Sequence, residues 1–195
     1  MKLKLFAASF FFAGASAFVL FGAPADEENA PAGYDQSRSV PKGEVTTETY
    51  ASKTLGLERK LTVYTPPGFD RSKKYPVLYL LHGAGDNETG WVQTGSANVI
   101  LDNLYASEKA VPMIVVMPNG FTRRPGDTPL GPDAPFEARR QAVNRFESEL
   151  LDDVIPVIEK RYPVIADSNH RALAGLSMGG SQTMRIGPTH PDTFA

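Results

Sequence analysis

Hydrophobic and polar positions divide the chain into a β-rich start and a later alternation of strands and helices. Two β-rich runs, 45–52 and 58–64, flank a short turn that contains Gly56, and they predict an antiparallel hairpin. Two continuous apolar runs follow at 77–81 and 113–117, and such runs are typical of strands buried on both faces of a parallel sheet. The pattern therefore predicts a hairpin followed by a parallel sheet.

Apolar residues at helical spacing lie between and beyond these strands. The segment 96–110 predicts a helix with Ser96 as a possible N-cap, so that a strand, a helix and a strand follow one another. A second helical segment, 137–162, carries one apolar stripe, and we expect Pro156 to kink its last turns.

The last part of the sequence predicts one more strand and one more helix. The strand falls at 170–176 and the helix at 178–186, where Gly187 and Pro188 end it. Strands that alternate with helices after an opening hairpin predict an α/β fold with a mainly parallel sheet and helices on both faces.

The N-terminal residues have the order of a secretory signal peptide. Lys2 and Lys4 precede an apolar run, 5–21, and small residues follow it. Cleavage after Ala25 or after Ala17 fits the small-x-small rule, and we favour Ala25 because it removes the whole apolar run. An uncleaved membrane anchor is the alternative. A cleaved signal predicts a periplasmic or extracellular protein.

Three regions result, and their composition limits what they can bind. We predict a signal peptide at 1–25, a polar flexible linker at 26–42, and an α/β domain at 43–195. With 20 Lys and Arg against 22 Asp and Glu, nothing indicates binding to nucleic acid, or stable membrane association after signal cleavage. With no cysteine and three scattered histidines, we expect no disulfide, metal site or cofactor.

A serine between two glycines is the strongest chemical signal. In RALAGLSMGG, Gly175, Ser177 and Gly179 fit G-x-S-x-G, in which the serine sits on a strained turn between a strand and a helix. The turn is so tight that a Cβ at either glycine would collide with its neighbours. A serine that merely caps a Gly-rich turn is the alternative. The strand predicted before Ser177 and the helix after it favour a nucleophile.

A nucleophilic serine needs two backbone N–H groups aimed at the developing oxyanion. Met178, directly after the serine, would give one. The loop LLHGAGDNETGW follows the apolar run 77–81, and we assign the second donor to the amide of Ala84, with Gly83 as the alternative. Glycines that serve only the geometry of a tight strand-to-helix connection are the alternative. We expect His82 to order the turn.

Trp91 and two aspartates each have two interpretations. Trp91, the single tryptophan, could line an aromatic substrate pocket or pack under a loop. Asp152 and Asp153, on the long predicted helix, are better explained as a solvated face or a helix–loop contact than as catalytic groups.

From about 75 to 195 the chain resembles the carbohydrate-esterase branch of the α/β-hydrolase superfamily. This branch includes feruloyl and acetyl-xylan esterases, with esterase D and the mycolyltransferases as relatives. The motifs YPVLYLLHGAGDNETGW, PMIVVMPNG, FESELLDDVIPVIEKRYPV and HRALAGLSMGG carry the resemblance. It implies an α/β-hydrolase fold, Ser177 as the acylated nucleophile, and Ala84 and Met178 as oxyanion donors.

The partners of the serine are not evident in the sequence. In α/β-hydrolases the acid and then the histidine follow the serine, but His190 and Asp192 stand in the reverse order. They also lie past the helix that Ser177 begins, on the order of 15 Å away. We expect the triad acid and histidine beyond Ala195. The domain would then be C-terminally incomplete, and the chain alone would hydrolyse little.

The sequence thus predicts an exported serine esterase that forms an acyl-enzyme on Ser177. The resemblance implies feruloyl or acetyl esters of plant cell-wall polysaccharide, or small-molecule esters, as substrates. Two alternatives stay open. One is an acyltransferase of the same fold, and the other is a non-catalytic carbohydrate-binding homologue, because a fold alone does not imply a function.

Overall fold

The computed structural model describes residues 33–124, 126–127, 131 and 133–195. The predicted signal peptide, 1–25, and the first part of the predicted linker lie outside the described residues. Within the described ranges, no helix combines the length and apolar character that crossing a membrane requires.

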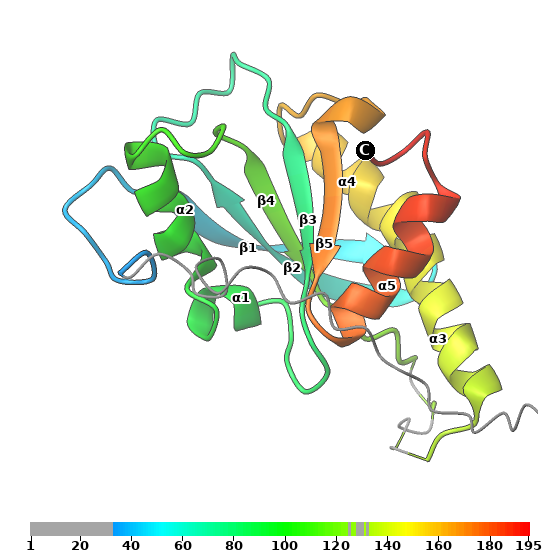
Figure 1. Ribbon diagram of the computed structural model, residues 1–195. Helices are drawn as coiled ribbons and strands as arrows, with labels where there is room; N and C mark the ends of the chain where they lie inside the picture. The colour runs from blue at the N-terminus through cyan, green and yellow to red at the C-terminus, as the bar shows by residue number, and fades with distance from the viewer. Residues whose placement is uncertain (1–32, 125, 128–130, 132) are drawn as a thin grey trace, which may run out of the picture. The chain divides into compact units, whose positions relative to one another are not determined.

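A mixed sheet forms the centre of the fold (Figure 1). Among the described residues it has five strands in the order β1-β2-β4-β3-β5, and their bounds are β1 Glu44–Ser52, β2 Leu57–Thr65, β3 Val77–Leu81, β4 Ile114–Pro118 and β5 Arg171–Gly175. Strands β1 and β2 form the predicted antiparallel hairpin, and β2 pairs antiparallel with β4. Strand β3 runs parallel to both β4 and β5. The hairpin and the parallel strands are therefore confirmed.

The apolar runs are continuous because each strand buries both of its faces. In β4, Ile114 and Val116 belong to the core cluster on one face of the sheet, and Val115 and Met117 belong to the cluster on the other. Successive side chains of a strand point to opposite faces, so an unbroken apolar run supplies two cores at once. Two layers of helices are required to cover them.

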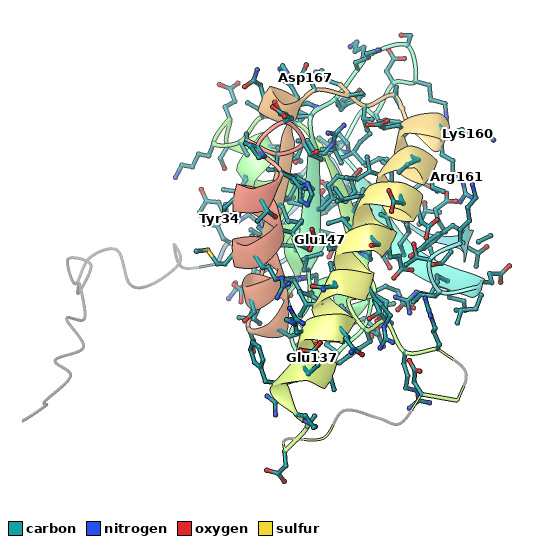
Figure 2. All side chains as sticks on the ribbon, turned by 90° about the vertical axis from the view of Figure 1, so that its right-hand side faces the viewer. Tyr34, Glu137, Glu147, Lys160, Arg161 and Asp167 are labelled. Carbon is teal, nitrogen blue, oxygen red and sulfur yellow. The ribbon has the colours of Figure 1, made fainter. Side chains whose placement is uncertain are left out.

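Helices cover both faces of the sheet (Figure 1). Two helices lie on one side, α1 (Gly90–Gln93) and α2 (Ala97–Ala106). Three lie on the other, α3 (Phe136–Glu149), α4 (Ile155–Arg161) and α5 (Met178–Ile186), and Figure 2 shows the α3–α4 helix with α5 alongside it. Short 3₁₀ turns precede β5 at Ser168–His170 and follow α5 at Gly187–Thr189.

The predicted helix at 137–162 is interrupted before its proline. A π-helical segment, Leu150–Val154, joins α3 to α4. Pro156 lies in the first turn of α4, where a proline is tolerated. Every fourth residue from Phe146 to Ile158 is fully buried. In an uninterrupted α-helix such a row drifts around the axis, and the wider π-turn corrects the drift.

Ser96 precedes α2 but does not cap it with its side chain. Its backbone is left-handed, with φ 50°, and its hydroxyl makes no cap hydrogen bond. A capping serine needs an extended backbone to reach back to the first free N–H groups. The predicted side-chain cap is therefore wrong.

The described end of the predicted linker packs on α2. The Asn103 side chain donates to the carbonyl oxygens of Tyr34 and Gln36, at 2.6 and 2.9 Å. The buried carboxylate of Asp102 accepts from Gly43 N–H and from the Tyr64 hydroxyl, each at 2.8 Å. Burial, and then the bond to Asp102, raises the pKa of Tyr64 well above its ordinary value. These bonds fasten residues 34–43 to the helix.

Strand β5 lies at one edge of the sheet that the described residues form. It pairs with β3 from Val77 opposite Arg171 to Leu81 opposite Gly175. On its other side, Ala195 N–H donates to Arg171 O at 3.1 Å.

Candidate active site

Ser177 stands where β5 gives way to α5, as the sequence predicts. It is exposed, and its backbone has φ 52° and ψ −109°, a conformation that a residue with a side chain rarely adopts. A Cβ on Gly175 would collide with the carbonyl carbon of Gly179, and a Cβ on Gly179 would lie 2.5 Å from Leu81 O. The predicted reason for both glycines is therefore confirmed.

Backbone hydrogen bonds hold this turn against β3. Leu176 N–H donates to Leu81 O at 3.1 Å, and Gly179 N–H closes the turn on Leu176 O at 2.9 Å. The Ser177 carbonyl accepts from Ser181 N–H at 2.9 Å and so begins the helix. The Ser177 hydroxyl forms no hydrogen bond with any described residue, which leaves it free for a reacting group.

The loop after β3 lies against the serine turn. A Cβ on Gly83 would lie 3.6 Å from both Ser177 Cβ and Leu176 O. The next residue, Ala84, is exposed, and none of the described residues accepts a hydrogen bond from its N–H. Met178 opens α5, so its N–H has no partner within the helix. The two amides predicted as oxyanion donors thus lie on the two turns that meet at Ser177.

His82 is buried and joins two loops. Its Nδ1 lies 2.8 Å from Gly83 O, and its Nε2 accepts from Gly120 N–H at 2.9 Å. The Gln182 side chain of α5 donates to Gly120 O at 3.0 Å. The expectation that His82 orders the turn is confirmed. Gly120, which directly follows Asn119 at the end of β4, was missed because its two partners come from β3 and α5.

A buried ion pair supports the same loop. Arg59 of β2 binds Glu149 of α3 through Nε at 3.0 Å, and its Nη2 donates to Asn119 O at 2.6 Å. Glu149 has no exposed surface, and the Tyr50 hydroxyl donates to it at 2.8 Å. Burial, and then the charge of Glu149, raises the pKa of Tyr50 well above its ordinary value. Arg and Glu are ordinary surface residues in a sequence, so only the fold reveals this pair.

Trp91 lines a hollow beside the serine turn. The hollow holds about 90 Å³ and is lined by His82, Gly83, Leu176 and α1, among others. Trp91 also packs on the α1–α2 side of the core, together with Leu101 and Tyr105. Its two predicted roles, a pocket wall and a packed side chain, are thus compatible. That it contacts substrate stays a prediction.

The other two histidines lie elsewhere. His170 bonds to Asp167 at 2.7 Å, and His190, past the end of α5, bonds to Glu147 at 2.8 Å. Figure 2 shows Glu147 on the side of α3 that faces α5. Neither histidine, nor His82, hydrogen-bonds to Ser177. Among the described residues, no group of three or more His, Cys, Asp or Glu could hold a metal ion.

Asp153 is a structural carboxylate, as expected for a helix–loop contact. It accepts from the N–H groups of Lys53 and Thr54 at 3.2 and 3.0 Å and from the Ser52 hydroxyl at 3.1 Å. Burial alone would raise the pKa of Asp153, but these hydrogen bonds outweigh it and hold that pKa below its ordinary value. Asp152, its neighbour, is exposed.

The match to known proteins decides the family. The family model described as "Putative esterase" matches residues 52–195, which include the whole sheet except most of β1. The chain belongs to this esterase family. Solved structures of α/β-hydrolase type share its fold, which confirms the predicted fold class.

Proteins similar to this chain include enzymes named as feruloyl or ferulic acid esterases. An endo-1,4-beta-xylanase/feruloyl esterase of Xylanibacter ruminicola is 39% identical over 166 residues, which cover 83% of this chain and 22% of that protein. The CE1 ferulic acid esterase of Anaeromyces mucronatus, solved with ferulic acid, is 32% identical with a TM-score of 0.76, over 85% of this chain and 60% of the other.

A mutant of the feruloyl esterase module from Clostridium thermocellum, complexed with sinapinate, is 29% identical with a TM-score of 0.68. The match covers 85% of this chain and 56% of that module. The chain therefore spans little more than half of the solved esterases and about a fifth of the Xylanibacter protein.

Proposed function

We propose that the protein is a serine carboxylesterase with Ser177 as its nucleophile. The observation that carries the proposal is the strained backbone of Ser177, which stands exposed between β5 and α5 with the Gly83–Ala84 loop against it. Such a turn holds a hydroxyl clear of the backbone and places it beside free N–H groups.

The reaction follows from this arrangement. The Ser177 Oγ attacks the ester carbonyl carbon while its proton passes to a general base, and the carbonyl oxygen becomes an oxyanion. The N–H groups of Ala84 and Met178 stabilise that charge. The C–O bond to the alcohol then breaks, the alcohol leaves with the proton, and water hydrolyses the acyl-enzyme.

The general base must reach the Ser177 hydroxyl within hydrogen-bond distance. His82, His170 and His190 each bind another group. None of the three therefore hydrogen-bonds to the Ser177 hydroxyl, and the general base is not assigned to any of them.

Feruloyl or acetyl esters of plant cell-wall polysaccharide are the proposed substrates. The names of the relatives support the feruloyl ester, and Trp91 offers an aromatic wall beside the serine turn. Export is part of the proposal, with cleavage after Ala25, and it predicts a mature protein that begins at Asp26. Mass measurement of the protein recovered outside the cytoplasm tests that N-terminus.

Hydrolysis of methyl ferulate and aryl acetates by the whole protein tests the function. Ser177→Ala should abolish turnover and the covalent adduct that a fluorophosphonate forms. Ser181→Ala, one turn further along α5 and also exposed, is the matched control and should keep both. Full activity in Ser177→Ala would refute the nucleophile. Products resolved by mass in the presence of a sugar acceptor would reveal acyl transfer if it occurs.

A further inference from the structure

The two bonds of His82 fix which ring nitrogen carries the proton. Gly120 N–H can only donate, so Nε2 of His82 must accept and be unprotonated. The neutral ring then carries its proton on Nδ1, which faces the Gly83 carbonyl oxygen at 2.8 Å. Both contacts are satisfied by one tautomer, and His82 as a residue is only 2% exposed, so water does not compete for them.

The bond to Gly83 O also sets the direction of the Ala84 N–H. The Gly83 carbonyl and the Ala84 N–H belong to one peptide unit, which is trans like the others in the described residues. In a planar trans unit the C=O and N–H bonds point in opposite directions. His82 therefore holds the oxygen on its own side and turns the N–H of the exposed Ala84 away from itself.

The bond to Gly120 extends the same connection to the buried ion pair. The Gly120 N–H and the Asn119 C=O belong to the same peptide unit. The oxygen of that unit accepts a hydrogen bond from Arg59 at 2.6 Å. The donors run in one direction, from Arg59 to Asn119 O, from Gly120 N–H to His82, and from His82 to Gly83 O. Hydrogen bonds aligned in this way polarise one another.

We propose that His82 is the positioning residue of the oxyanion site. Held by the Asn119–Gly120 peptide that Arg59 anchors, it orients and polarises the Ala84 amide through the Gly83 carbonyl. The inference rests on the proposed esterase function and adds a role that the nucleophile motif does not contain.

Two substitutions at His82 separate its bonds. In His82→Asn the amide nitrogen occupies roughly the place of Nδ1 and can still donate to Gly83 O. In His82→Gln the longer side chain reaches the place of Nε2 and can still accept from Gly120 N–H. The first keeps the bond that orients Ala84, and the second loses it. His170→Gln, on an exposed histidine, is the matched control.

The test measures kcat and KM of the whole protein on an aryl acetate. His82→Gln should lose about 10²-fold in kcat, the scale of a lost oxyanion donor, with KM within about twofold. His82→Asn should lose no more than about tenfold, and His170→Gln should match the parent. Equal losses in both His82 variants, or no loss in either, would overturn the inference, whereas activity in Ser177→Ala would overturn the esterase function itself.

The unmodified protein supplies a second readout that does not depend on folding of the variants. Nitrogen-15 NMR of labelled histidine distinguishes the two neutral tautomers. A His82 ring protonated on Nδ1 and bare on Nε2 supports the inference, and a ring protonated on Nε2 contradicts it.

Discussion

The two turns that meet at Ser177 are held in different ways. The turn after β5 is shaped mainly by close steric contacts, because Gly175 packs against Gly179 and Gly179 packs against Leu81 of β3. The turn after β3 depends on Gly120, 38 residues from His82, and through Asn119 on Arg59. One turn therefore depends on the space around two glycines, and the other depends on side-chain hydrogen bonds across the sheet. A side chain added at one of the glycines should therefore affect the first turn, and loss of a distant polar side chain should affect the second.

The largest expected effect comes from removing the distant support. Arg59→Met leaves Glu149 buried without a cation, and we expect a loss of about 4 kcal/mol in the free energy of unfolding. Urea unfolding measures it. Arg140→Met is the control, because the pair of Arg140 with Glu137 is exposed to solvent and its loss should be close to neutral. In Arg59→Met, amide hydrogen exchange should speed up more at 82–85 than at 175–179, relative to the unmodified protein. An equal increase in both turns would show that they do not differ in their support.

A local clash should be slightly less costly. Gly179→Ala places a Cβ 2.5 Å from Leu81 O, so β3 and α5 must separate, at about 3 kcal/mol. Gly187→Ala, in open space at the end of α5, is the matched control and should be close to neutral. Thermal unfolding of both variants measures the difference. Comparable melting temperatures would show that the turn after β5 can relax.

Strain at the nucleophile should appear as a gain in stability. Ser177→Gly permits the positive φ without a Cβ, and we expect about 1 kcal/mol of stabilisation. Ser177→Ala is the comparison, because it removes the same hydroxyl and keeps the Cβ. Chemical unfolding of the pair measures the strain, and equal stability would show that the turn stores none.

The smallest effect concerns another turn that a distant side chain holds. The pKa of Asp153 is lower in the folded protein than in the unfolded chain, so its contribution is present above the ordinary Asp pKa of about 4 and is lost as the pH falls through the folded value. In Asp153→Asn the melting temperature should fall less steeply as the pH is lowered than it does in the unmodified protein. Asp152→Asn removes an exposed neighbouring carboxylate and should leave the slope unchanged.

Local sequence pattern predicted the elements that local forces shape. Continuous apolar runs located β3 and β4, and the glycines around Ser177 located the start of α5 to the residue. The pattern failed at Ser96, where a suitable capping residue adopts a left-handed backbone that prevents capping. Residue type alone does not reveal the backbone angle that a residue adopts in the connection between α1 and α2.

The supports of the site could not be predicted for a different reason. Arg59 and Glu149 are 90 residues apart, and His82 meets Gly120 only because β3 lies beside β4. Which polar groups meet depends on strand order and register, which a single sequence does not display. Similarly, the π-turn at Leu150–Val154 becomes evident only when the whole buried row of that helix is known.

The pairing of Val77 with Arg171 has a consequence for the order of folding. The β1–β2 hairpin closes over a few residues, whereas β5 must find β3 across more than ninety, and distant pairings form slowly. The strain at Ser177 can be borne only after that pairing exists. During synthesis the nucleophile therefore acquires its geometry only after β5 has been made and has paired with β3.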